Sequence, residues 1–282
     1  MEDIVLLNIL VLGGIALAAA VVLYFVSQKF AVADNPKVAA VEECLPQANC
    51  GGCGKAGCHD FATACAQADE TEFACLYCPV GGFKVMQQIA SVLGYAAVEK
   101  APTVSVLRCN GTCEKAPAKV CYDGVSSCRI AARISSGQTG CPDGCLRLGD
   151  CVKVCKFDAL HIDPVTGIPV VDRDKCTSCG ACVNICPRHL FEIRPVAADG
   201  SQVYVACRNT QKGAIARKNC SAACIACLKC TKINPEVKVE NYLSYIPDTV
   251  DPREFGEILA SACPTGAIIY QRGTASKETT DD

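Results

Sequence analysis

The chain has 282 residues, of which 25 are cysteine, and its formal net charge at pH 7 is only −2. Basic and acidic residues are mixed along it, without the basic block that would indicate binding to nucleic acid. Eight Phe, eight Tyr and no Trp predict a modest apolar core, so we expect groups held by the cysteines to help stabilise the fold.

Residues 1–28 are predicted to form a membrane anchor. The stretch Ile4–Val26 reads IVLLNILVLGGIALAAAVVLYFV, and about 20 apolar residues are enough to span a bilayer. A buried core helix is rarely apolar on every face for this length, and a signal peptide would begin with basic residues instead of two acidic ones. Lys29 and Lys37 follow the span, so we expect a single pass with the N-terminus outside and the rest in the cytoplasm.

Cysteine at this density has three interpretations, and the spacing of the cysteines chooses among them. Disulfides need an oxidising compartment, which a cytoplasmic location argues against. A structural zinc site takes four ligands that commonly include histidine, and the chain has three histidines in all. Iron–sulfur clusters take short C-x2-C-x2-C runs followed by Cys-Pro, and such runs recur along this chain.

Residues 29–42 are expected to be a linker, and residues 43–100 a first iron–sulfur module with the motif CGGCGKAGC followed by CPVGG. Its glycines let backbone N–H groups approach the sulfurs. A zinc ribbon would show two C-x2-C pairs instead. Cys75 is the rival for the fourth position, and Cys44 and Cys65 have no assigned role. The predicted 4Fe–4S ligands are Cys50, Cys53, Cys58 and Cys78.

Residues 101–200 contain the most specific motif, CTSCGACVNICP, which is a complete bacterial ferredoxin run. In two-cluster ferredoxins the fourth cysteine of each run binds the other cluster, so a partner run is expected upstream. CPDGCLRLGDCVKVC supplies it, with Leu148 in the middle place and Cys141 as the substitute. The predicted sets are Cys155, Cys176, Cys179 and Cys182 for one cluster, and Cys141, Cys145, Cys151 and Cys186 for the other.

The segments after Cys155 and Cys186 each predict a helical turn that leads into a strand, and the turns at 164–167 and 199–200 are expected to close hairpins. Upstream, four cysteines within twenty residues suggest a fifth cluster. Its membership is open, because Cys141 could join in place of Cys121, and Cys121 could be a free cysteine. The residues of this group are Cys109, Cys113 and Cys128, with Cys121 as a further candidate.

Residues 201–274 repeat the ferredoxin unit. A shift of 79 residues takes Cys141 to Cys220 and Leu148 to Cys227, but it takes Cys155 to Asn234. The second half of the repeat supplies a single Cys-Pro, and the three places before it hold Arg253, Gly256 and Leu259. One site is thus complete and the other has lost every ligand, which predicts a single cluster in this unit. Its predicted ligands are Cys224, Cys227, Cys230 and Cys263, and Cys207 and Cys220 stay unassigned.

The predicted fold class is α+β, with one N-terminal transmembrane helix followed by small iron–sulfur modules that include tandem ferredoxin-like domains of the bacterial two-cluster type. Residues 275–282 are expected to be a solvated tail. The sequence predicts four 4Fe–4S clusters, and a fifth if the cysteines at 109–128 bind one. We find no Rossmann fingerprint, P-loop or nucleophile–base pair, so we expect no NAD site and no substrate turnover by this chain alone.

A membrane anchor, then CGGCGKAGC and CPVGG, then CNGTC, then ferredoxin runs ending in CPTGAI resembles the B subunits of Rnf complexes over essentially the whole chain. Those complexes are ion-translocating ferredoxin:NAD+ oxidoreductases. The resemblance implies that the chain takes electrons from a soluble ferredoxin and passes them to other membrane subunits, while a different subunit handles NAD and the redox energy moves Na+ or H+. Fuller members carry the second cysteine set of the last unit.

The order of the modules predicts that electrons leave through the module nearest the anchor and are accepted at the distal ferredoxin-like end. Two other classes of protein remain as alternatives. One is a structural zinc protein, and the other is a corrinoid iron–sulfur methyl carrier, whose large cobalamin-binding barrel this chain has no room for. Iron and sulfide analysis with EPR of the reduced protein separates them.

Overall fold

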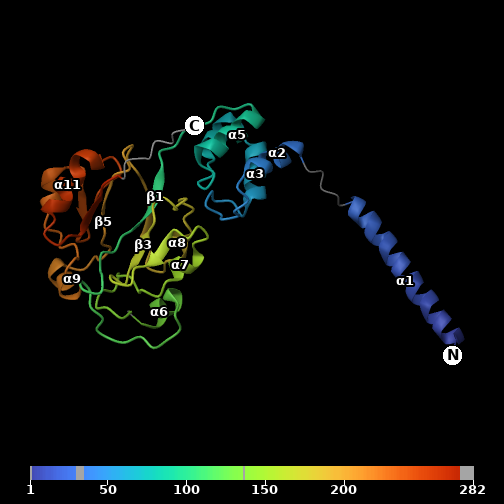
Figure 1. Cartoon of the computed structure of the whole chain (residues 1–282), viewed down its shortest axis with the longest axis horizontal. Coiled ribbons are helices and arrows are strands. Elements are labelled where there is room, and N and C mark those ends of the chain that lie inside the picture. The colour runs from blue at the N-terminus through green and yellow to red at the C-terminus, as the bar shows by residue number, and fades with distance from the viewer. Residues whose placement is uncertain (1, 30–34, 136, 274–282) are drawn as a thin grey trace, which may run out of the picture.

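The computed structural model describes residues 2–29, 35–135 and 137–273 (Figure 1). Helix α1 (Glu2–Lys29) stands apart from the other elements, and its side chains from Leu10 to Val26 are exposed. Within these described ranges, no helix combines the length and the apolar character needed to cross a membrane. The expected tail at 275–282 lies outside the described residues.

The N-terminal module is built from α2 (Pro36–Cys44), α3 (Cys58–Gln67), α4 (Glu70–Cys75) and α5 (Gly82–Leu93). The Asn35 side chain caps α2 by accepting the Lys37 N–H, and Asp69 caps α4 in the same way. Val41, Phe61 and Ile89 pack in one core. Helix α2 therefore belongs to this module, although the sequence placed it in a linker over 29–42.

The first ferredoxin-like unit contains β1 (Thr103–Leu107), α6 (Cys128–Ile134), α7 (Asp150–Val154), β2 (Leu160–Ile162), β3 (Pro169–Val171), α8 (Ala181–Ile185) and β4 (Phe191–Pro195). Strand β1 pairs antiparallel with β4, and β2 pairs with β3. The turn at 164–167 joins β2 to β3, as expected. Helices α7 and α8 contact each other, and each begins after a left-handed glycine, Gly149 (φ 76°) and Gly180 (φ 75°).

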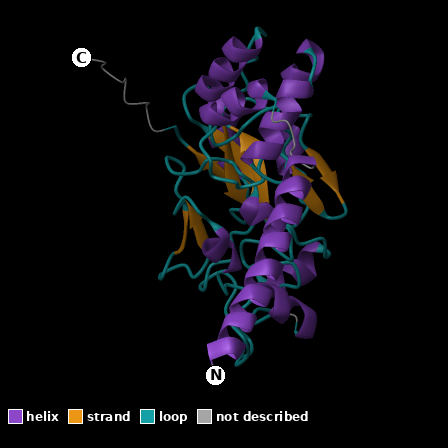
Figure 2. Cartoon of the chain, turned by 90° about the vertical axis from the view of Figure 1, so that its right-hand side faces the viewer, coloured by secondary structure: helices purple, strands orange, loops and turns teal. Residues whose placement is uncertain are grey.

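The second unit repeats this arrangement with β5 (Gln202–Val205), α9 (Gly213–Asn219), α10 (Lys229–Ile233), β6 (Lys238–Glu240), β7 (Leu243–Tyr245), α11 (Pro252–Ala262) and β8 (Ile268–Gln271). Strand β5 pairs with β8, and β6 with β7. The strands are short, and helices and loops make up most of the chain (Figure 2). The hairpin expected at 199–200 is wrong, because β4 and β5 pair with other strands and this turn links the two units.

Helix α11 covers the three places where the last unit lacks cysteines. Leu259 is fully buried, and it packs in one core with Ile246 and Val250. A side chain at Gly256 would collide with the ring of Tyr270. Packing therefore fills the space at Gly256 and Leu259, whereas Arg253, the third place, is exposed and lines a cavity at the start of α11.

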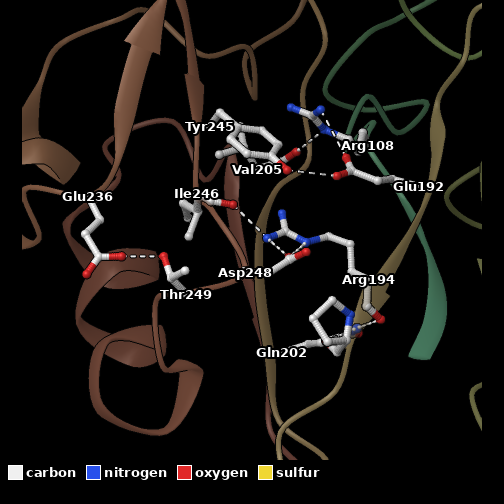
Figure 3. Close-up of polar contacts among 11 residues, drawn as sticks. Arg108, Glu192, Arg194, Gln202, Val205, Glu236, Tyr245, Ile246, Asp248 and Thr249 are labelled. Atoms are coloured by element: carbon white, nitrogen blue, oxygen red, sulfur yellow. Dashed lines mark hydrogen bonds and ion pairs between the residues drawn. The ribbon is translucent and has the colours of Figure 1, made fainter. Parts of the chain in front are cut away.

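The two ferredoxin-like units meet through a polar interface (Figure 3). Arg108 pairs with Glu192 at 3.1 Å, and its Nε donates to the carbonyl of Val205 in the other unit. Arg194 of the first unit pairs with Asp248 of the second at 2.6 Å. The Tyr245 ring lies beneath both guanidinium groups, and its centre is 5.3 Å from Cζ of Arg108 and 5.5 Å from Cζ of Arg194.

Candidate metal centres

Four cavities in the described chain are each lined by at least four cysteines. Each has a volume of about 20 Å³, so the four are alike in size. A cavity without cysteine, between β4 and the start of α11, has a volume of about 300 Å³. The four small cavities therefore form a class of their own.

The first cavity is lined by Cys155, Cys176, Cys179 and Cys182, which is one of the sets expected from the cross-ligation rule. The Ser105 hydroxyl lies 3.2 Å from the sulfur of Cys182. Burial raises the pKa of Cys182, the hydrogen bond with Ser105 lowers it in part, and the neighbouring Cys176 and Cys179 raise it. Thr177 also lines the cavity, and its buried hydroxyl has no partner. This orphaned hydroxyl is a donor free to contact a bound group.

The second cavity is lined by Cys128, Cys145, Cys151 and Cys186, with Cys128 in the place where the sequence predicted Cys141. Cys128 begins α6, and this end of the helix is fixed by Asp150, which accepts from the Ser127 hydroxyl at 2.9 Å and from the Arg129 N–H at 3.1 Å. Burial, followed by the charges of Cys128 and Cys186, raises the pKa of Cys151 to about 12.

The third cavity is lined by Cys224, Cys227, Cys230 and Cys263, the set expected for the last unit. Cys263 directly follows α11. The Ser244 hydroxyl lies 3.3 Å from the sulfur of Cys230. Burial alone would raise the pKa of Cys263, but hydrogen bonds from the backbone of Thr265, Ile268 and Ala267 and from the Thr265 hydroxyl lower it overall. Such hydrogen bonds stabilise a thiolate and hence a metal ligand.

The fourth cavity is lined by Cys109, Cys141, Cys207 and Cys220, and also by Cys145, which lines the second cavity as well. The sequence assigned no role to Cys207 and Cys220. The sequence had grouped Cys109 with Cys113 and Cys128, but Cys128 lies in the second cavity and Cys113 is exposed. The Cys113 sulfur accepts a hydrogen bond from Arg147 at 3.5 Å. Cys121 is exposed as well and lines none of the four cavities.

In the N-terminal module, Cys78 lies in the buried core, and Cys53 and Cys58 pack against that core. Burial raises the pKa of Cys78, although backbone hydrogen bonds from Gly81 and Val80 lower it in part. Cys78 is buried and accepts the Gly81 N–H at 3.4 Å. Cys58 begins α3, and its N–H donates to Asn49. The rival Cys75 is exposed, and its thiol donates to the carbonyl of Thr71.

The donors around these sulfurs fit iron–sulfur chemistry. A 4Fe–4S cluster attaches each thiolate to a different iron atom, and its reduction potential depends on hydrogen bonds to sulfur. The N–H groups of Gly81, Arg147 and Leu190 each donate to a cysteine sulfur at 3.4 Å. Among the residues described, no three His, Cys, Asp or Glu side chains converge closely enough to hold a single metal ion; a cluster with separate irons does not require that convergence.

Two families of iron–sulfur domains match parts of this chain. Residues 139–190 match the 4Fe-4S dicluster domain, and residues 45–77 match a family described as a putative Fe-S cluster. The second match includes Cys75 and ends one residue before Cys78. In the structure, Cys78 is the residue that is buried in the core against which Cys53 and Cys58 pack.

Curated relatives match over most of the chain. The B subunit of the ion-translocating oxidoreductase complex of Methanosarcina acetivorans is 38% identical over 271 residues, which cover 95% of this chain and 99% of that protein. The B subunit of the proton-translocating ferredoxin:NAD(+) oxidoreductase complex of Clostridium ljungdahlii is also 38% identical, over 94% of this chain and 92% of its own length.

The B subunit of the Na(+)-translocating ferredoxin:NAD(+) oxidoreductase complex of Acetobacterium woodii is 38% identical over 79% of this chain and 65% of its own length. The identity to full-length relatives, together with the dicluster match and the cysteine cavities, settles the family. The chain belongs to the B subunits of ion-translocating oxidoreductase complexes, the Rnf complexes.

Proposed function

We propose that this chain accepts electrons from reduced soluble ferredoxin and delivers them to the membrane subunits of an Na+- or H+-translocating ferredoxin:NAD+ oxidoreductase. When bound, 4Fe–4S clusters supply one-electron carriers, and the chain's part is to hold and space them. The proposed ligand sets are Cys50, Cys53, Cys58 and Cys78; Cys155, Cys176, Cys179 and Cys182; Cys128, Cys145, Cys151 and Cys186; and Cys224, Cys227, Cys230 and Cys263.

The close approach of two cysteine loops carries this proposal. A Cβ added at Gly52, in the N-terminal module, would lie 2.8 Å from both the Cα and the carbonyl oxygen of Cys179 in the first ferredoxin-like unit. The Nζ atom of Lys156 in that unit also lies 3.4 Å from the carbonyl oxygen of Ala48 in the N-terminal module. The two modules therefore present their cysteine loops to each other, as a route for electrons requires.

The distal end of the chain has the features of a docking surface for an electron donor. In the loop that enters α10, Cys227 is exposed and Leu228 is 49% exposed. Lys229 and Lys232 of α10 are exposed beside them. An apolar contact with a basic rim suits a transient complex with an acidic carrier such as ferredoxin, with a rate of association that falls as salt is added.

For the membrane attachment, we propose that α1 is a single-pass anchor with its N-terminus outside. The support is the apolar sequence Ile4–Val26 and the exposure of the described side chains from Leu10 to Val26. Lys29 and Lys37 would then hold the iron–sulfur modules on the cytoplasmic side. A reporter enzyme fused to the C-terminus should be active in the cytoplasm, and activity in the exported compartment alone would refute this orientation.

A pair of double variants tests the direction of transfer. In Cys50→Ser/Cys53→Ser, ferredoxin should still reduce the distal clusters while transfer to the partner subunits stops. In the matched variant Cys227→Ser/Cys263→Ser, ferredoxin should reduce the remaining clusters slowly, although the N-terminal module is intact. Both are followed by EPR after mixing with reduced ferredoxin. If the first variant abolishes reduction of the distal clusters and the second does not, the order is refuted.

A further inference from the structure

The cavity lined by Cys109, Cys141, Cys207 and Cys220 has the thiols of a cluster site. A Cβ added at Gly111 would lie 3.5 Å from the sulfur of Cys109 and 3.7 Å from that of Cys220, so these two sulfurs face the same point. Cys141 and Cys207 line the same cavity, at whose edge Cys145 also lies. The four cysteines therefore come together at one site.

The same four cysteines are related by the internal repeat. Cys109 follows β1, the first strand of its unit, and Cys207 follows β5, the first strand of the other. Cys141 and Cys220 are 79 residues apart, the shift that superposes the two units in sequence. Each unit thus contributes one cysteine after its first strand and one before its ferredoxin run.

A matching pair of hydrogen bonds supports this relation. The N–H of Cys145 donates to the sulfur of Cys109 at 3.4 Å, and the N–H of Cys224 donates to the sulfur of Cys207 at 3.4 Å. Cys145 and Cys224 are also 79 residues apart, and each lines the cluster cavity of its own unit. The fourth cavity therefore lies between the second and the third, joined to each by one backbone hydrogen bond to sulfur.

The cavity wall suits a negatively charged group. Arg208 and the carboxylate of Asp143 line it, together with Arg108, whose guanidinium pairs with Glu192. Asn209 is almost fully buried, and its Nδ2 lies 3.3 Å from the sulfur of Cys141. Four thiolates around an iron–sulfur core carry a net negative charge, which the amide donor of Asn209 and the nearby Arg208 would stabilise in a buried site.

We propose that Cys109, Cys141, Cys207 and Cys220 bind an additional 4Fe–4S cluster that bridges the two ferredoxin-like units. This site accounts for two cysteines that neither ferredoxin run uses, and it ties the units together through ligands from both. The proposal relies on the proposed function for the kind of group bound, whereas a count of iron needs neither ferredoxin nor a partner subunit.

The test measures iron, zinc and acid-labile sulfide in the full chain purified without oxygen. Cys207→Ser and Cys220→Ser should each lose about four iron atoms per chain, the content of one cluster. The matched controls Cys113→Ser and Cys121→Ser should lose none. Full iron in the first two variants, iron loss in Cys113→Ser, or zinc in place of the missing iron overturns the proposal.

A serine variant that fails to fold would lose all its iron, so a second variant keeps every thiol. Asn209→Leu removes the amide donor to Cys141 and should leave the iron content unchanged. Loss of a hydrogen bond to sulfur disfavours the reduced state, so one reduction potential, followed by EPR in a redox titration, should become more negative while the others stay in place. If every potential stays unchanged, the bridging site is refuted.

Discussion

The ion pair between Arg194 and Asp248 is expected to stabilise the contact between the two ferredoxin-like units, and Asp248→Asn tests this. The Nε and Nη2 atoms of Arg194 donate to Asp248 Oδ1 at 2.9 and 2.6 Å, and Nη2 also donates to the carbonyl of Ile246 at 2.7 Å. The arginine side chain is 4% exposed, whereas the aspartate side chain is 47% exposed. The substitution therefore leaves a buried guanidinium without its counter-charge.

The exposure of the two side chains sets the size of the effect. Breaking a fully buried pair costs about 3–5 kcal/mol, and breaking an exposed one about 0.2–1 kcal/mol. Because the carboxylate of Asp248 is half in water, we expect a coupling energy of about 2 kcal/mol between the two residues. The carbonyl of Ile246 remains as an acceptor in the variant but carries no charge, and the buried Nη1 of Arg194 has no partner.

The coupling is measured by a double-mutant cycle with Asp248→Asn and Arg194→Met. The readout is the rate at which iron–sulfur absorbance is lost in denaturant without oxygen, because a chain of several domains has no single free energy of unfolding. If the ion pair breaks in the rate-limiting step, a coupling energy of about 2 kcal/mol corresponds to a roughly 30-fold increase in the rate at which iron–sulfur absorbance is lost. The matched cycle with Glu257→Gln and Arg272→Met removes an ion pair whose side chains are 68% and 73% exposed. Equal coupling in the two cycles would refute the reasoning.

Three further outcomes are expected. Cys78→Ser should lose about four iron atoms per chain and Cys75→Ser none; the reverse result would make the exposed Cys75 the ligand. Cys263→Ser should also lose about four iron atoms per chain. Asn234→Ala, at the position where the repeat lacks a cysteine, should lose no iron in the same analysis. Leu259→Ala should destabilise the last unit by about 2–5 kcal/mol, because a fully buried leucine leaves a cavity; an unchanged rate of absorbance loss from this unit in denaturant would contradict that packing.

The sequence predicted the features that depend on short-range spacing. The run CTSCGACVNICP places Cys176, Cys179 and Cys182 on one loop, and the cross-ligation rule adds Cys155 to the same cavity. The same rule brings Cys263 to the loop of the last unit, across the full length of α11. These groupings follow because both halves of a ferredoxin unit are short and have a fixed topology.

The groupings that the sequence did not predict depend on how separate segments pack. Spacing put Cys141 in one set with Cys145, and both line the fourth cavity, where Cys141 lies beside cysteines of the other unit. Cys128 on α6 is the residue that joins Cys145 in the second cavity. The position of α6 is set by the hydrogen bonds of Asp150, which no cysteine spacing encodes. The repeat shift that relates Cys141 to Cys220 was the one indication of the fourth cavity in the sequence. Equivalent residues of two repeated units can lie together where the units contact each other.

The position of the ligand set that the second unit lacks can be related to the positions of the cavities. Within the first unit, the cavity that contains Cys145 adjoins the fourth cavity, and the cavity that contains Cys179 faces the N-terminal module. In the second unit, the retained cavity contains Cys224, the counterpart of Cys145, and it also adjoins the fourth cavity. The deleted set is the counterpart of the one that contains Cys179, which in this unit would lie at the outer end. With the proposed ligand sets, its absence would leave the succession of sites from the exposed Cys227 to the N-terminal module unbroken, and Leu259 of α11 packs in the core of the unit.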